Sequence, residues 1–413
     1  MLPDKMDAPM TSKPIYLDHQ ATTPTDPRVV EAMLPFFGER FGNPHSTAHS
    51  FGRDAEAAVE TARGQIAEVI GAEAREIVFT SGATESNNLA IKGAARFHAG
   101  RKDHLITPVT EHKCVLESVK RMQREGFRVT WLAVGADGLL DPDDVKKALT
   151  ATTALVSVMA ANNEIGVLQP IAEIAALCRA AGAYFHTDAA QAFGKIPLDV
   201  RDMGIDLMSV SGHKVYGPKG IGVLYVRRRP RVRLLAEMDG GGQERGLRSG
   251  TLPAPLCVGL GEAARLAALE MMTEAQRLAG LRDRLLDRLR QRVPGLTVNG
   301  DLARRLPGNL NVSFPGALAP KLMDAVPDVA VSTGSACTSA SLEPSYVLRA
   351  LGRSDELAHS SLRMTVGRYS TEEEIDFAIS TIRLNVSKLR DLSPLWDMYK
   401  EGIDISTIQW AAH

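Results

Sequence analysis

Between residues 76 and 228 the chain alternates short apolar runs with segments of helical periodicity, and this alternation constrains the fold more than any other feature. Strands separated by helices usually pair in parallel, because each helix carries the chain back along the sheet before the next strand begins. The pattern predicts an α/β fold with a mainly parallel, seven-stranded sheet flanked by helices. The expected strands are 76–80, 104–109, 129–134, 154–159, 183–188, 207–210 and 222–226.

The last two of these strands are separated by too few residues for a helix, so we expect a less regular edge there. A long helix and a smaller α+β segment follow. Apolar residues recur at helical spacing from about residue 255 to 292, and Pro294 then ends the helix. Beyond it we expect strands at 309–314 and 361–366 and a helix at 371–390.

Length and charge limit what the chain can be. Its 413 residues suit two domains, and we expect a large domain at 24–270 and a small domain formed by 1–23 and 271–413. The formal net charge of −1 argues against nucleic acid or an anionic membrane as the main partner. No stretch is apolar enough to span a membrane, and the first residues carry acids, so we expect a cytoplasmic protein.

Lys214 is the first candidate catalytic residue. It ends the run Ser-Gly-His-Lys at 211–214, directly after an expected strand and before a turn rich in glycine. A partly desolvated lysine in such a turn can form a Schiff base with a carbonyl cofactor, because desolvation frees the amine. A lysine with a structural partner is the plainer interpretation, so the assignment depends on other residues.

Those residues follow the ends of neighbouring strands, where ligands bind in open parallel sheets. Residues 80–88 predict an anion site at a helix N-terminus, and His112 could serve as an acid–base group or stack on a flat cofactor. Asn163 and Gln191 could contact a ligand oxygen, and Asp188 could pair with a protonated pyridine nitrogen. Each could instead be a cap, a turn former or a structural side chain. Their occurrence together along one edge indicates a pyridine cofactor that carries a phosphate.

Four cysteines are present, and none has the spacing of a self-contained metal site. Cys114, Cys178 and Cys257 are expected to be packing residues. Cys337 lies instead in a run of small and polar residues, at about 331–345, which has too few large apolar side chains to be buried. Because a reactive thiol needs access and a stabilised thiolate, Cys337 is the candidate nucleophile, on an expected mobile loop.

Taken with these motifs, the chain resembles the class V, fold-type I pyridoxal-phosphate enzymes, and among them the IscS-type cysteine desulfurases. The resemblance covers nearly the whole length. Its end, 392–410, resembles the tail that docks the iron–sulfur scaffold protein in this family. Its most specific segments are 16–24, 41–45, 79–86, 162–166, 211–214, 248–251 and 335–344.

The resemblance implies a role for each candidate residue, with pyridoxal 5'-phosphate as the cofactor. Lys214 would hold the cofactor covalently and Cys337 would accept sulfur. The residues that would contact the phosphate are Ala83, Thr84, Ser211, His213 and, toward the partner subunit, Thr251. Those that would contact the ring are His112, Asn163, Asp188 and Gln191, and those that would bind the substrate are Asn163 and Arg363.

The implied reaction converts L-cysteine to L-alanine and leaves a persulfide on Cys337, for iron–sulfur cluster assembly and for other acceptors such as tRNA thiolation. The implied partners are a second copy of the chain and an IscU-type scaffold protein. No intrinsic metal site is expected, although Cys337 could ligate a cluster in transit. A selenocysteine lyase, an aminotransferase and a non-catalytic scaffold stay open as alternatives, and the Cys337 thiol argues against the aminotransferase.

Overall fold

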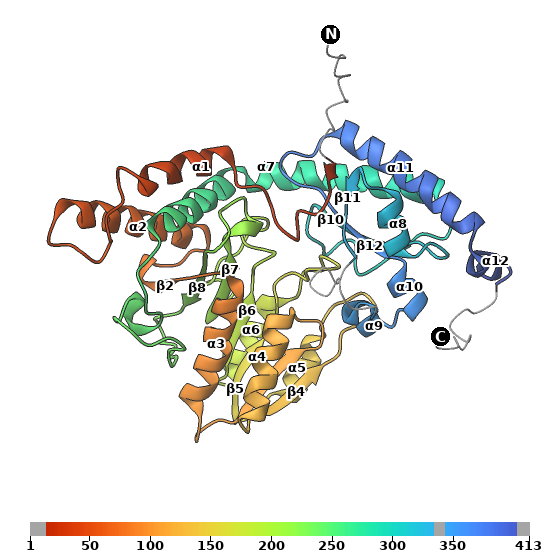
Figure 1. Cartoon of the computed structure of the whole chain (residues 1–413). Coiled ribbons are helices and arrows are strands. Elements are labelled where there is room, and N and C mark those ends of the chain that lie inside the picture. Colours follow the sequence, from red (N-terminus) through yellow and green to blue (C-terminus); the bar gives the residue numbers. More distant parts are fainter. Residues whose placement is uncertain (1–13, 334–342, 403–413) are drawn as a thin grey trace, which may run out of the picture.

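The structure is a computed structural model that describes residues 14–333 and 343–402. Within these residues the largest sheet has seven strands in the order β2-β8-β7-β6-β5-β3-β4 (Figure 1). All of these strands run in one direction except β8, which is antiparallel to β2 and β7. The strands are β2 (Ile77–Thr80), β3 (His104–Pro108), β4 (Arg128–Leu132), β5 (Thr153–Ser157), β6 (Tyr184–Asp188), β7 (Leu207–Ser211) and β8 (Gly222–Val226).

The predicted mainly parallel sheet is confirmed, but the expected place of its last strand is wrong. Strand β8 lies between β2 and β7 and not at an edge. The connection from β7 to β8 is too short for a helical crossover, so β8 must return antiparallel. Gly222 permits β8 to lie close to Gly82, the residue before α3, because a Cβ atom at position 222 would lie 2.6 Å from the Cα of Gly82.

Helices cover both faces of this sheet. Alternate strand residues point to opposite faces, so Val78 joins one core while Ile77 and Phe79 join the other. Burial on both faces explains why the strands are apolar almost without interruption. The helices over the first face are α3 (Ala83–His98) and α4 (Lys113–Arg124), and those over the second are α2 (Ser50–Val69), α6 (Ile171–Ala180) and α7 (Ala254–Arg292).

A smaller unit has its own core around a three-stranded antiparallel sheet in the order β12-β10-β9. A separate short strand pair joins β1 (Ile15–Tyr16) in parallel to β11 (Val329–Ala330). The sheet strands are β9 (Thr297–Val298), β10 (Asn309–Ser313) and β12 (Ser361–Thr365). After α7 come the helices α8 (Ala319–Ala325), α9 (Tyr346–Ala350), α10 (Asp355–His359), α11 (Glu372–Asp391) and α12 (Pro394–Lys400), and α1 (Pro27–Met33) and α5 (Pro142–Ala148) belong to the larger unit. Helices α9 and α10 share a separate small core with Ile165 and Val167.

Helix α7 joins the two units as one uninterrupted element of 39 residues (Figure 1). Its first half buries Leu260 and Ala264 in the larger core, and its second half buries Leu281 and Leu285 in the smaller one. The predicted domain boundary at 270/271 therefore falls inside a helix and stays a prediction. None of the helices in the described residues is both long and apolar enough to cross a bilayer.

A buried ion pair ties α2 to the first strand of the sheet. Both terminal nitrogens of Arg63 lie 2.8 Å from the carboxylate oxygens of Glu244, and both side chains are almost fully buried. Glu244 also accepts a hydrogen bond of 2.7 Å from the backbone N–H of Phe79, and Arg63 donates to the carbonyl of Ile77. These hydrogen bonds satisfy both charges inside the protein, as a buried pair requires.

We expect Glu244→Ala to lower the free energy of unfolding by about 3–5 kcal/mol, because it leaves the Arg63 charge buried without a partner. The measurement is urea unfolding followed by circular dichroism. Glu60→Ala is the matched control, since Glu60 pairs with the same guanidinium but is 55% exposed. Its expected loss is below about 1 kcal/mol. Equal losses in the two variants would contradict the argument from burial.

Candidate active site

The site lies where the parallel strands end. Because β2, β3, β5, β6 and β7 share one direction, their carboxyl ends meet at one edge of the sheet, and the segments that follow them face a common space. A cavity of about 480 Å³ opens there. The predicted site residues that line it are Ala83, Thr84, His112, Asn163, Asp188, Gln191, Ser211, His213 and Lys214.

One end of the cavity is built to receive an anion. Helix α3 starts at Ala83, and its N-cap, Gly82, provides no side-chain cap for the first-turn amides. Gly82 has a φ of 152°, a conformation that residues with a side chain rarely adopt. Ala83 and Thr84, whose amides no N-cap side chain occupies, line the cavity at the positive end of this sixteen-residue helix.

Asp188 is the buried carboxylate of the site. It ends β6 and is only 5% exposed. Its Oδ1 accepts from the backbone N–H of Ala190 at 2.9 Å, and its Oδ2 accepts from Asn87 Nδ2 at 2.7 Å. Two residues earlier, His186 lies between Ser157 and Ser209, with hydrogen bonds of 2.8 and 3.0 Å. Burial lowers the pKa of His186 to about 4, so the imidazole of His186 is neutral near Asp188.

His112 is the N-cap of α4 and contacts Cys114 through its Nδ1. Burial lowers the pKa of His112, the carboxylate of Asp188 opposes that shift, and the Lys214 cation adds to it. Cys114 packs against the core as expected, but its sulfur also lines the cavity. Asn87 and Cys114 were not predicted as site residues. Helical periodicity could have indicated Asn87, which lies one turn after Thr84.

The turn that carries Lys214 is held from several sides. Lys214 ends the short 3-10 helix η3 (Gly212–Lys214), and Tyr216 adopts the left-handed conformation with a φ of 62°. The Tyr216 N–H donates to Thr23 Oγ1 at 2.9 Å, and its phenol oxygen accepts from the N–H of Arg368 at 2.6 Å. A strained residue persists only where its surroundings hold it this firmly, so the position of Lys214 is tightly specified.

Arg363 and Thr251 lie outside the lining of the cavity. Arg363 on β12 pairs with Asp18 Oδ1 at 2.7 Å and donates to the carbonyl of Asn163 at the same distance, so it adjoins the cavity through Asn163. Its Nε is buried with no hydrogen-bond partner among the described residues. Thr251 is exposed. Cys337 lies outside the described residues.

The side chains around the cavity fit pyridoxal 5'-phosphate. The uncapped N-terminus of α3 suits the phosphate, and the Asp188 carboxylate suits a pyridine nitrogen. Asn163 Oδ1 and Gln191 Oε1 are buried and lack partners among the described residues, so polar atoms of a ligand would complete them. In the same residues no group of three or more His, Cys, Asp or Glu side chains is arranged to hold a metal ion.

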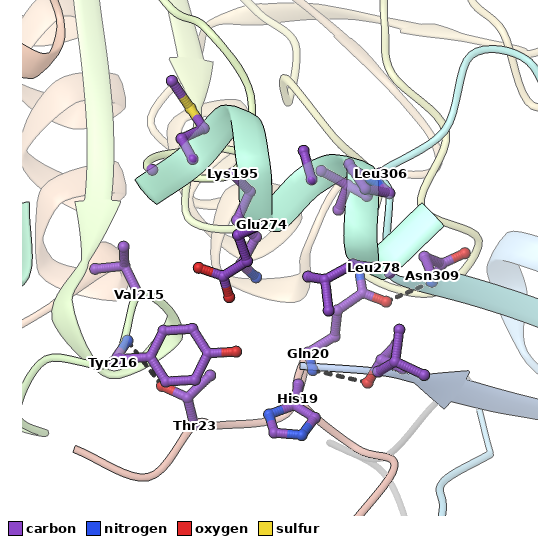
Figure 2. A pocket seen from close by; sticks show the side chains of 17 residues that line it. His19, Gln20, Thr23, Lys195, Val215, Tyr216, Glu274, Leu278, Leu306 and Asn309 are labelled. Carbon is purple, nitrogen blue, oxygen red and sulfur yellow. Dashed lines mark hydrogen bonds between the residues drawn. The ribbon is translucent and has the colours of Figure 1, made fainter. Parts of the chain in front are cut away.

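A second, mainly apolar pocket lies behind the Lys214 turn. Val215 and Tyr216 form part of its wall, and Figure 2 shows Glu274 and Tyr216 pointing toward its open centre. The Lys195 side chain also lines it and makes no hydrogen bond or ion pair within residues 14–333 and 343–402. Burial lowers the pKa of Lys195 to about 7, with a further contribution from Lys214.

Comparisons with known proteins extend over both units. The family model described as aminotransferase class-V matches residues 15–377. The chain is 58% identical over 400 residues to the cysteine desulfurase IscS of Rickettsia bellii. The matched region covers 97% of this chain and 98% of that protein. A solved NifS-like protein superposes with a TM-score of 0.85 at 37% identity, over 91% of this chain and 100% of that one. The structure of SspA in complex with cysteine has a TM-score of 0.77 at 39% identity, over 86% of this chain and 100% of that one.

The buried amine of Lys195 predicts a pH dependence of stability. Its folded-state pKa is about 7, while the ordinary value is 10.5. Between these pH values the unfolded chain binds more protons at this position than the folded chain, so stability rises with pH. We expect wild type to gain stability relative to Lys195→Met as the pH rises through this window.

The measurement is the melting temperature of both proteins near pH 7 and near pH 10.5, the two ends of the window. Lys146→Met is the matched control, because Lys146 is exposed on α5 and its removal should leave the pH dependence as in wild type. A constant difference between wild type and Lys195→Met at the two pH values would contradict the assignment.

Proposed function

Since this chain belongs to the class-V aminotransferase family and, within it, to the IscS-type cysteine desulfurases, we propose that it converts L-cysteine to L-alanine and carries the sulfur as a persulfide. The observation that carries the proposal is the meeting of Lys214, Asp188 and His112 around one cavity. The whole-length relatives named as cysteine desulfurases support it, and so does the related SspA, whose structure holds cysteine.

Pyridoxal phosphate, when bound, supplies a protonated ring that withdraws electrons from the α-carbon of the substrate. We assign Asp188 to the ring nitrogen, because its buried carboxylate would hold the nitrogen in the protonated state. Lys214 Nζ would be the covalent attachment point and, once displaced, would serve as the base that takes the α-proton. Ala83 and Thr84 in the first turn of α3, with Ser211 and His213, would hold the phosphate.

Arg363 is the proposed anchor for the substrate carboxylate. It already orders Asn163 through the carbonyl of that residue, and its Nε is an unused donor. A guanidinium beside Asn163 can hold a carboxylate through two parallel hydrogen bonds. The ion pair with Asp18 fixes the guanidinium before substrate arrives, so binding requires little further ordering.

Cys337 is the proposed sulfur acceptor. Its thiolate attacks the sulfur of the substrate, the carbon–sulfur bond breaks, and the electron pair of that bond stays with the substrate carbon skeleton. Protonation of this carbon yields L-alanine, and the substrate sulfur remains on Cys337 as a persulfide. A thiol and L-cysteine thus give a persulfide and L-alanine, with no external oxidant or reductant. Cys337 could ligate an iron–sulfur cluster during transfer.

A homodimer is part of the proposal. Phe37, Phe41 and Phe51 are 65%, 66% and 53% exposed, and the Phe41 and Phe51 rings lie 5.4 Å apart. An exposed aromatic cluster of this kind is typical of a protein interface. Thr251 is exposed and lies outside the cavity of its own chain, so it is available to the phosphate site of a second copy.

The proposed recipient of the sulfur is an iron–sulfur scaffold protein of the IscU type, bound by the C-terminal tail, with tRNA thiolation as a further use. Part of this tail lies outside the described residues. A reducing cytoplasm is the proposed compartment, because a persulfide chemistry based on Cys337 requires a free thiol, and Cys114, Cys178 and Cys257 are also free.

We expect Cys337→Ser to lower alanine release from L-cysteine by at least about 100-fold, because it removes the nucleophile itself. The measurement is alanine formed in the presence of a reductant, with the visible absorbance of the bound cofactor recorded in parallel. The matched control is Ser339→Ala, two positions away, which should release alanine at nearly the wild-type rate.

Retention of the cofactor absorbance in Cys337→Ser would place the defect in sulfur transfer and not in cofactor binding. Equal alanine release by wild type and Cys337→Ser would refute the role of Cys337. It would favour a lyase in which sulfur leaves without a protein nucleophile.

A further inference from the structure

A continuous series of hydrogen bonds runs from Asp188 to His112 through Asn87, which had no predicted role, and Cys114, which was expected only to pack. Asn87, on α3, donates from Nδ2 to Asp188 Oδ2 at 2.7 Å, and the same nitrogen lies 3.1 Å from Cys114 Sγ. Cys114, in the first turn of α4, places that sulfur 2.9 Å from His112 Nδ1. Two helices and the end of β6 are therefore joined at the cavity wall.

The donor-to-acceptor direction of these hydrogen bonds follows from which atoms carry a proton. The backbone N–H of Cys114 points at His112 Nδ1 at 3.3 Å, and an amide N–H can only donate, so Nδ1 must present a lone pair. The amide nitrogen of Asn87 likewise donates to the Cys114 sulfur. The Thr84 hydroxyl also contacts this sulfur and can donate to it, so the thiol proton is directed to His112 Nδ1 at 2.9 Å. A neutral imidazole has one ring proton, which this arrangement leaves on Nε2.

The charge states agree with this direction. Burial lowers the pKa of the His112 ring, Asp188 on β6 opposes the shift, and Lys214 on η3 and Lys113 on α4 add to it. Burial raises the pKa of the Cys114 thiol to about 12, and Asp188 and the buried Glu111 act in the same sense. A neutral ring and a protonated thiol are the two states that the hydrogen bonds require.

We propose that Asn87 and Cys114 are positioning residues that hold His112 as the neutral tautomer with its proton on Nε2. The inference rests on the proposed function, since it concerns the same site. It adds that His112 enters the reaction as a proton donor through Nε2, and that the carboxylate assigned to the ring nitrogen is coupled to this donor. Cys114 is thus a hydrogen-bond donor as well as a packing residue.

The test is nitrogen NMR of the substrate-free holoenzyme labelled with ¹⁵N-histidine, and His112→Gln identifies the signals of His112. We expect an unprotonated Nδ1 and a protonated Nε2 in wild type. Cys114→Ala keeps the backbone N–H that donates to Nδ1, so the ring proton should stay on Nε2, but loss of the thiol donor should raise the apparent pKa of His112 by about one, which corresponds to one ordinary hydrogen bond. Asn87→Ala should shift the ring in the same direction by a smaller amount.

Cys114→Ser separates positioning from packing, because its hydroxyl can donate to Nδ1 although it is smaller and more polar than the thiol. Recovery of the wild-type pKa of His112 in Cys114→Ser, but not in Cys114→Ala, would support the proposal. A proton on Nδ1 in wild type, or the same pKa of His112 in wild type and Cys114→Ala, would overturn it. Because no substrate is present, a failure to form alanine would count against the proposed function alone.

Discussion

The common direction of the sheet strands is the constraint on which the site depends. Five segments that are far apart in the sequence end at one edge only because β2, β3, β5, β6 and β7 run the same way. That arrangement is stable because helices bury both faces of the sheet, which a parallel sheet requires. The cavity is therefore a consequence of the packing of the whole larger unit, and no single motif creates it.

Much of the fold and of the site could be predicted from the sequence, because the patterns that specify them lie within short segments. Strand β6 and the turn at Lys214 have apolar and glycine patterns that predict them directly. Once parallel pairing is assumed, the meeting of Asp188, His112 and Lys214 follows from strand direction alone. The residues at the strand ends could therefore be proposed together before any distance was known.

What the sequence did not reveal depends on contacts between distant segments. The position of β8 between β2 and β7 is a matter of sheet order, which periodicity does not encode. The hydrogen bonds of Cys114 depend on how α3 lies against α4, so its apolar neighbours alone indicated only packing. The ion pair of Arg363 with Asp18 joins residues 345 positions apart. The role of Cys337 stays a prediction.

The continuity of α7 limits how the two units can move relative to each other. At 1.5 Å per residue its 39 residues form a rod about 58 Å long that is anchored in both cores. A hinge opening between the units would have to break this rod or pull one half out of its core. The distance between the two units should therefore stay nearly constant through the catalytic cycle. The segments that move to admit substrate or acceptor should lie outside α7.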